Sequence, residues 1–152
     1  MQSGFRAGVR LAIDWGDARI GVAACDPQGL LAYPVENVAS GKTAEGRIAE
    51  LVREHDAIEL IVGLPRSLSG EEGPSANKVR RHARSLAKRV RPVRVRLLDE
   101  RLTTVSAARA LSESGRRAHQ QRSVIDMAAA VTILQHALDT ERAGSPPGEL
   151  LT

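Results

Sequence analysis

The sequence has little cysteine, few aromatic residues and no long apolar run, and each shortage excludes a class of protein. A single cysteine among 152 residues rules out an internal disulfide framework. No stretch approaches the roughly 18 apolar residues of a membrane helix. The first ten residues, MQSGFRAGVR, lack the apolar segment of a signal peptide. We therefore expect a cytoplasmic protein that is not attached to a membrane.

The lone cysteine, Cys25, follows the small and apolar residues Val22, Ala23 and Ala24. This setting favours a small buried residue on a strand. An intersubunit disulfide or a reactive thiol is the alternative. The oligomeric state, monomer or homodimer, stays open at this point.

The aromatic residues are Phe5, Trp15 and Tyr33. Proteins that bind single strands stack successive bases on aromatic platforms, and three scattered rings are too few to predict one. If the partner is a nucleic acid, we expect recognition of backbone and shape rather than base reading.

Positive charge is concentrated in one segment. Lysine and arginine outnumber aspartate and glutamate by 22 to 18, which gives a net charge of +4. Residues 78–96 hold nine basic residues and no acidic one: Lys78, Arg80, Arg81, Arg84, Lys88, Arg89, Arg91, Arg94 and Arg96. Such a surplus attracts a polyanion such as nucleic acid.

The length predicts one domain, over residues 9–142, between a flexible N-terminus (1–8) and a flexible C-terminal tail (143–152). The first half favours three antiparallel strands, with Pro34 placing the third at a sheet edge. Their expected ranges are Arg10–Asp14, Arg19–Asp26 and Leu31–Val38.

The second half alternates helix and strand, which is typical of parallel pairing. The expected elements are a helix over Thr43–His55, an apolar strand over Ile58–Val62, a helix from Pro74, a strand over Val93–Leu98, a helix from Thr103 or Thr104 to Ser112 and a last helix over Ser123–Arg142. Long loops are expected over Gly63–Gly73 and Gly115–Arg122. The fold class is therefore α/β, with a mixed five-stranded sheet, three antiparallel strands and then two parallel ones, flanked by helices.

Three acidic residues stand where this topology brings strand ends and the last helix together: Asp14, Glu100 and Asp126. Each has a structural alternative. Asp14 is also suited to cap a turn before Trp15, and Glu100 to pair with Arg101. Asp126 matches the second position of a capping box opened by Ser123.

Together the three acids predict a metal site. Several hard oxygen ligands at one point suit Mg²⁺ or Mn²⁺, and two such ions would activate a water and stabilise the leaving oxygen of a phosphodiester. Two other motifs carry no such prediction. Ser40–Thr43 ends like a phosphate-binding loop, but Glu36 stands where that loop needs glycine. The four histidines lack the spacing of a zinc site.

Four segments of the chain resemble the signature segments of the YqgF/RuvX family, whose members are known as pre-16S rRNA nucleases and as Holliday junction resolvase-like proteins. They are LAIDWGDARIGVAACDPQGLLAYPVENV, IVGLPRSLSGEEGPSANKVRRHARSL, LLDERLTT and VIDMAAAVTILQHAL, which run from the first strand to the last helix. The resemblance implies an RNase H-like fold. It assigns metal-binding and catalytic roles to Asp14, Glu100 and Asp126.

Further positions match the family's pattern with less defined roles. Those around the expected active site are Gly16, Gly63, Pro65, Gly70, Gly73, Arg101 and Thr104. We expect nucleic-acid contacts from the basic helix and the basic loop, through Lys78, Arg81, Arg84, Lys88, Arg101, Arg116, Arg117 and Arg122.

The leading hypothesis is thus a nuclease that uses Mg²⁺ or Mn²⁺ on structured RNA or branched DNA. The two candidate substrates are the 5′ end of the 16S rRNA precursor, in ribosome biogenesis, and four-way DNA junctions, in recombination. A nucleotide binder of the sugar-kinase type needs two lobes, and 152 residues supply one. A binding module whose acids have no catalytic role is the remaining alternative.

Overall fold

The computed structural model describes residues 5–67, 69–103 and 118–151, and for residues 118–126 it describes the backbone alone. Its helices are α1 (Ala44–Glu54), α2 (Pro74–Arg89), a short 3₁₀ helix η1 (Glu100–Leu102) and α4 (Ala118–Arg142). The described strands are β1 (Arg10–Trp15), β2 (Arg19–Cys25), β3 (Ala32–Ala39), β4 (Glu59–Leu64), β5 (Arg94–Asp99) and β6 (Glu149–Leu150). They form one sheet in the order β3-β2-β1-β4-β5-β6.

The predicted strand directions are confirmed. β1, β2 and β3 pair antiparallel in succession, and β4 pairs parallel with both β1 and β5. The β1–β2 turn is closed by the amide of Gly16, which donates to the carbonyl of Arg19 at 2.9 Å. β3 lies at the sheet edge, as Pro34 predicts, because proline cannot donate to a neighbouring strand.

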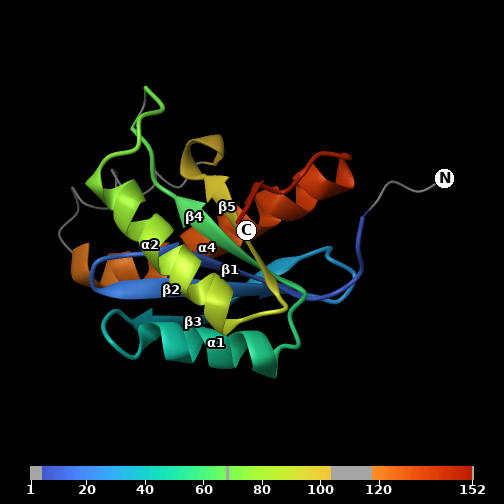
Figure 1. Cartoon of the computed structure of the whole chain (residues 1–152), viewed down its shortest axis with the longest axis horizontal. Helices are drawn as coiled ribbons and strands as arrows, with labels where there is room; N and C mark the ends of the chain where they lie inside the picture. The colour runs from blue at the N-terminus through green and yellow to red at the C-terminus, as the bar shows by residue number, and fades with distance from the viewer. Residues whose placement is uncertain (1–4, 68, 104–117, 152) are drawn as a thin grey trace.

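Helices cover both faces of the sheet, with α1 and α2 on one side and α4 on the other (Figure 1). Alternation along β1 explains the two layers, since successive side chains point to opposite faces. Leu11 and Ile13 pack in the core under α1 and α2, whereas Ala12 packs under α4 with Ala130 and Ile133. The α/β class is confirmed, with three layers.

The sheet has six strands rather than the expected five. β6 pairs antiparallel with β5 and lies within the segment expected to be a tail. Without it, β5 would be an edge strand with open backbone groups. Gly148 allows the close approach, because a Cβ there would lie 2.5 Å from the carbonyl oxygen of Leu97.

The last helix begins at Ala118, five residues before the expected start at Ser123. The polar stretch from Ala118 to Arg122 carries no apolar pattern, so the sequence favoured a loop there. Asp126 is the ninth residue of α4, so Ser123 and Asp126 do not open the helix as a capping box. The helix expected to end at Ser112 lies outside the described residues.

Cys25 is fully buried on β2, as the small and apolar residues before it predict. Burial raises the pKa of its thiol, although a hydrogen bond from the backbone amide of Arg10 opposes the shift. Both observations fit a packing residue rather than a reactive thiol. Among the described helices none is long and apolar enough to cross a bilayer.

Candidate active site at the carboxyl ends of the strands

The strand register surrounds Asp14 with glycines. Asp14 pairs with Gly21 of β2, and on the other side the β1–β4 register runs to Ile13 and Val62, one residue before Asp14 and Gly63. Asp14 alternates with Ile13 and therefore shares the α4 face of the sheet with Ala12. The residue is fully buried. Asp14 therefore has a glycine on each neighbouring strand.

Glu100 occupies the space that Gly63 leaves. A Cβ added at Gly63 would lie 3.0 Å from Oε1 of Glu100 and 2.6 Å from Cδ1 of Ile133. The Glu100 carboxylate therefore lies over β4, about 5 Å, one strand spacing, from β1, which carries Asp14. It is also buried, at 4% exposure. The structure thus brings together two of the three predicted acids.

α4 carries position 126 toward the same end of the sheet. Its last turn lies near the start of β1, where Glu141 pairs with Arg10 at 2.8 Å, and Ile133 reaches Gly63. The helix therefore runs antiparallel to β1. Position 126 lies about two turns before Ile133 along α4. Its side chain is outside the described part of the structure.

The structure bears on the two structural alternatives, a turn-capping role for Asp14 and an ion pair between Glu100 and Arg101. β1 continues through Trp15, so Asp14 lies inside the strand rather than at the turn. Arg101 makes its ion pair with Asp99, at 2.7 Å. Hydrogen bonds from the Arg101 side chain hold the pKa of the Asp99 carboxyl below its usual range, against the opposing effect of burial.

The loop after β4 packs beside these acids. Arg66 pairs with Glu72 at 3.0 Å and approaches Asp99 at 3.7 Å. Gly70 has a φ of +91°, and a Cβ there would lie 3.0 Å from the Arg101 guanidinium. Both facts connect the loop with the Asp99–Arg101 pair, which flanks Glu100 in the sequence.

The other expected loop positions have plainer surroundings. Pro65 is half-buried, and Gly73 directly precedes α2 as its N-cap. Gly16 lies in the β1–β2 turn, where its carbonyl accepts a hydrogen bond from the Ser40 hydroxyl at 2.9 Å. Thr104 is outside the described residues.

The basic helix divides into paired and exposed residues. Arg80 is held by Glu72 at 2.6 Å and Glu149 at 3.1 Å. Arg81, Arg84 and Lys88 are exposed, and no ion pair is recorded for them among the described residues. Arg116 and Arg117 lie outside the described residues, as does the side chain of Arg122. Lys78 lies 3.6 Å from Asp17.

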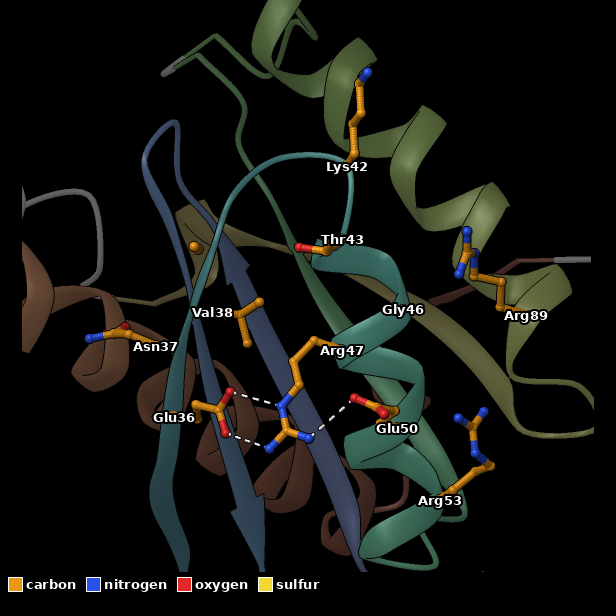
Figure 2. A pocket seen from close by; sticks show the side chains of 11 residues that line it. Glu36, Asn37, Val38, Lys42, Thr43, Gly46, Arg47, Glu50, Arg53 and Arg89 are labelled. Atoms are coloured by element: carbon orange, nitrogen blue, oxygen red, sulfur yellow. Dashed lines mark hydrogen bonds and ion pairs between the residues drawn. The ribbon is translucent and has the colours of Figure 1, made fainter.

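A hollow of about 690 Å³ opens away from the acidic end. It lies between β3 and α1, and Figure 2 shows Arg47 between Glu36 and Glu50 on its wall. Arg47 pairs with Glu36 at 2.8 Å, so the central charges of the hollow compensate one another. Asn37 points away from it, toward the side of α4 (Figure 2).

A second charged cluster lies at the opposite end of the sheet, and the sequence pattern did not predict it. Arg6 pairs with Glu59 at 2.8 Å and with Glu141 at 2.6 Å, Arg10 pairs with Glu141, and Arg96 pairs with Glu59 at 2.9 Å. Glu59 is fully buried inside the strand that was expected to be apolar. That single acid in an apolar run is the signal that could have revealed the cluster.

Comparison with known proteins gives consistent matches. The family model described as "RuvX: Holliday junction resolvase" matches residues 8–140. A protein of Streptomyces coelicolor named "Putative pre-16S rRNA nuclease" is 58% identical and covers 95% of this chain and 88% of its own length. A protein of the same name from Nocardioides is 60% identical and covers 96% of this chain and 97% of its own length.

A solved structure shows the same fold at low identity. Thermus thermophilus RuvC in complex with a Holliday junction substrate has a TM-score of 0.56 and 16% identity, covering 95% of this chain and 99% of its own. The RNase H-like fold expected from the sequence is therefore confirmed. By its match over residues 8–140 and its identity to these relatives, this chain belongs to the RuvX family.

Proposed function

We propose that the chain is a metal-dependent nuclease that processes the 5′ end of the 16S rRNA precursor, with Asp14, Glu100 and Asp126 as its catalytic and metal-binding acids. The observation that carries the proposal is the pair of buried carboxylates, Asp14 and Glu100, beside Gly63. Burying a carboxylate is costly, and these two lie where the parallel strands end, which is where open α/β sheets place their binding crevices. A cytoplasmic place of action is part of the proposal.

The donor set fits a divalent cation. Carboxylate oxygens are the ligands that Mg²⁺ and Mn²⁺ prefer, and the missing side chain at Gly63 lets the Glu100 carboxylate lie close to β4. The described side chains hold no group of three or more acidic, histidine or cysteine ligands, and the third proposed ligand, Asp126, is outside that description. When bound, the cation supplies charge to stabilise a phosphodiester undergoing hydrolysis.

The chain's own residues place the substrate around that point. The carboxylates of Asp14 and Glu100 are positioned by strand ends, which are rigid. The exposed arginines of α2 supply positive charge for the backbone phosphates. α2 begins at the carboxyl end of the strands, as the acids do, because it follows the loop after β4. A strand held on α2 can therefore extend to the acidic end.

The choice of RNA rests on the names of the relatives, and the junction alternative rests on the name of the matched family. One assay tests both. The purified chain is incubated with a precursor RNA containing the 5′ end of 16S rRNA and with a synthetic four-way DNA junction, each with Mg²⁺, with Mn²⁺ and with excess EDTA. We expect cleavage of the RNA with either ion and none in EDTA.

Full turnover in EDTA would overturn the metal role. Cleavage of the junction alone would replace the proposed substrate. Binding of both without cleavage would favour the alternative of a binding module whose acids have no catalytic role.

A further inference from the structure

A groove lies on the opposite face of the sheet from the acids, at the same end of β1. Alternation puts Asp14 and Trp15 on opposite faces, and Trp15 packs against the core under α1 and α2. Its indole stacks on the His82 ring of α2, with centroids 4.0 Å apart and 16° between the planes. A hollow of about 650 Å³ opens beside this pair, between α2 and the start of α1.

The cations around the groove outnumber the acids that remain available. Lys42, Lys78 and Arg89 line it, together with Asp17 and Glu45. The Glu45 carboxylate already accepts hydrogen bonds from the Ser85 hydroxyl and from His82 at 3.0 Å, and lies 3.5 Å from Arg89. Its negative charge is therefore satisfied inside the protein.

The two lysines are the cations free to meet a ligand. Lys78 lies 3.6 Å from Asp17, which is fully exposed, so this pair is weak and exchangeable. Lys42, on the turn before α1, makes no ion pair with any described residue, and Figure 2 shows it extending toward α2. Two ammonium groups thus flank a stacked aromatic pair.

We propose that this groove binds an unpaired stretch of the nucleic-acid substrate, with backbone phosphates on Lys42 and Lys78 and a base against the Trp15–His82 pair. The inference rests on the proposed function, and it specifies a single-stranded segment that passes the same end of the sheet as the acids, on the other face. A volume of about 650 Å³ lies within the usual range of about 300–1,000 Å³ for ligand pockets. Aromatic rings beside cations are the usual means of holding single strands.

This assignment revises the expectation that the chain has too few aromatic residues for stacking. His82 completes the platform, and 67 positions separate it from Trp15, so the pairing is created by the fold. Asp14 and Trp15 are consecutive residues. They lie on opposite faces of β1, so the groove and the proposed reaction site are at the same end of the sheet.

Trp15 is the only tryptophan, so its fluorescence reports on the groove directly. The full-length Asp14→Asn variant, which is not expected to cleave, is titrated with a single-stranded oligoribonucleotide and with a duplex of the same sequence. We expect a saturable change in Trp15 emission with the single strand and none with the duplex. If a labelled single strand binds by anisotropy while Trp15 emission stays constant, it binds elsewhere and the proposal is overturned.

A paired-lysine variant tests the interaction with phosphates. Lys42→Ala/Lys78→Ala should reduce the slope of log K against log salt by about 1.4, because each lysine that neutralises a phosphate of a single strand adds roughly 0.7 to that slope. The matched control is Arg94→Ala, which removes an exposed charge at the start of β5, at the opposite end of the strands. An unchanged slope in the double variant, with its fold verified by circular dichroism, would also overturn the proposal.

These outcomes separate the groove from the nuclease proposal. A change in Trp15 emission in a protein that cleaves neither the RNA nor the junction leaves the groove standing and removes the nuclease function. Metal-dependent cleavage without a change in Trp15 emission supports the nuclease function and removes the groove from the substrate-binding surface.

Discussion

The two ends of the sheet bury carboxylates in different settings. At the amino ends of β1 and β4, Glu59 and Glu141 each lie against arginines, at 2.6 to 2.9 Å. At the carboxyl ends, Asp14 and Glu100 lie about one strand spacing apart beside a glycine. Burial alone therefore does not distinguish a structural acid from a functional one. For Glu59 and Glu141, the arginine partners identify a structural network.

The largest effect on activity is expected from substitutions at the carboxyl end of the sheet. Asp14→Asn, Glu100→Gln and Asp126→Asn should each reduce cleavage by on the order of a thousandfold. The unfolding midpoint should stay constant or rise, because neutralising one of several clustered carboxylates relieves repulsion. Single-turnover cleavage and thermal unfolding of each variant provide the two measurements.

The control is Asp139→Asn, an exposed residue in the second half of α4. It should retain both activity and midpoint. Collapse of stability in the Asp14 or Glu100 variants would mean that these acids belong to a structural network. Retained activity in Asp126→Asn would remove that residue from the site.

At the opposite end the pattern should reverse. Glu59→Gln should lower the free energy of unfolding by about 3 kcal/mol, because it removes the buried ion-pair partner of Arg96 and leaves Arg6 with Glu141 alone. Cleavage per folded molecule should be unchanged. Urea unfolding measures the loss. Glu50→Gln is the matched control, because its pair with Arg47 is exposed and worth well under about 1 kcal/mol. Equal losses in both variants would contradict the comparison.

Gly63 tests whether the space beside Glu100 matters. Gly63→Ala places a methyl group 2.6 Å from Ile133 and 3.0 Å from the Glu100 carboxylate. We expect a loss of about 1–3 kcal/mol in stability from overpacking, and a lower kcat with little change in KM. Gly46→Ala, whose Cβ would meet nothing closer than 3.6 Å, is the control. Wild-type kcat in Gly63→Ala would show that Glu100 does not need this space.

Sequence patterns predicted the architecture because they report local periodicity. The alternation in β1 and β2, Pro34 at the edge and the apolar stripe of α2 each depend on neighbours within a few residues. Val79, Ala83 and Leu86 are all buried as that stripe requires. The additional strand β6 was not predicted, because a two-residue strand is too short to show an alternating pattern in the sequence. It forms by pairing with β5.

The candidate site was predictable in part for a related reason. Asp14 is the residue before the last of β1, and Glu100 directly follows β5. Both strands run parallel to β4, which lies between them, so topology places the two acids at the same end of the sheet. The Arg6–Glu59–Glu141 cluster joins residues 53 and 135 positions apart. No local rule connects such distant residues. The same holds for Trp15 and His82, whose stacking depends on how α2 packs on the sheet.

Acid should weaken the amino end selectively. Burial acts to raise the pKa of Glu141, but hydrogen bonds from Arg6 outweigh it and hold that pKa below its usual value. A carboxyl with a lowered folded-state pKa contributes stability above its unfolded pKa, about 4.3, and loses it as the pH falls through the folded value. Glu141→Gln should therefore be less stable than the wild type at pH 7, with the difference shrinking below about pH 4. A difference that does not vary with pH, in unfolding measured from pH 7 to pH 2, would contradict this.

The smallest expected effect concerns α2, whose exposed arginines lie outside both clusters of acids. If Arg81 and Arg84 bind backbone phosphates, Arg81→Ala/Arg84→Ala should flatten the dependence of log K on log salt by roughly one unit for each arginine replaced. The cleavage rate at saturating substrate should be unchanged, because the metal ligands lie on other elements. The effect should also fall along the helix. Lys88 lies ten residues beyond Lys78, and therefore about 15 Å further along α2 from the end of the sheet that carries the acids. Lys88→Ala should therefore change the slope less than Arg81→Ala. Binding titrations at several salt concentrations measure all three variants. An unchanged slope in the double variant would mean that this face of α2 is merely solvated, and the positive charge that holds the substrate would then have to come from Lys42, Lys78 and the basic segment Gly115–Arg122.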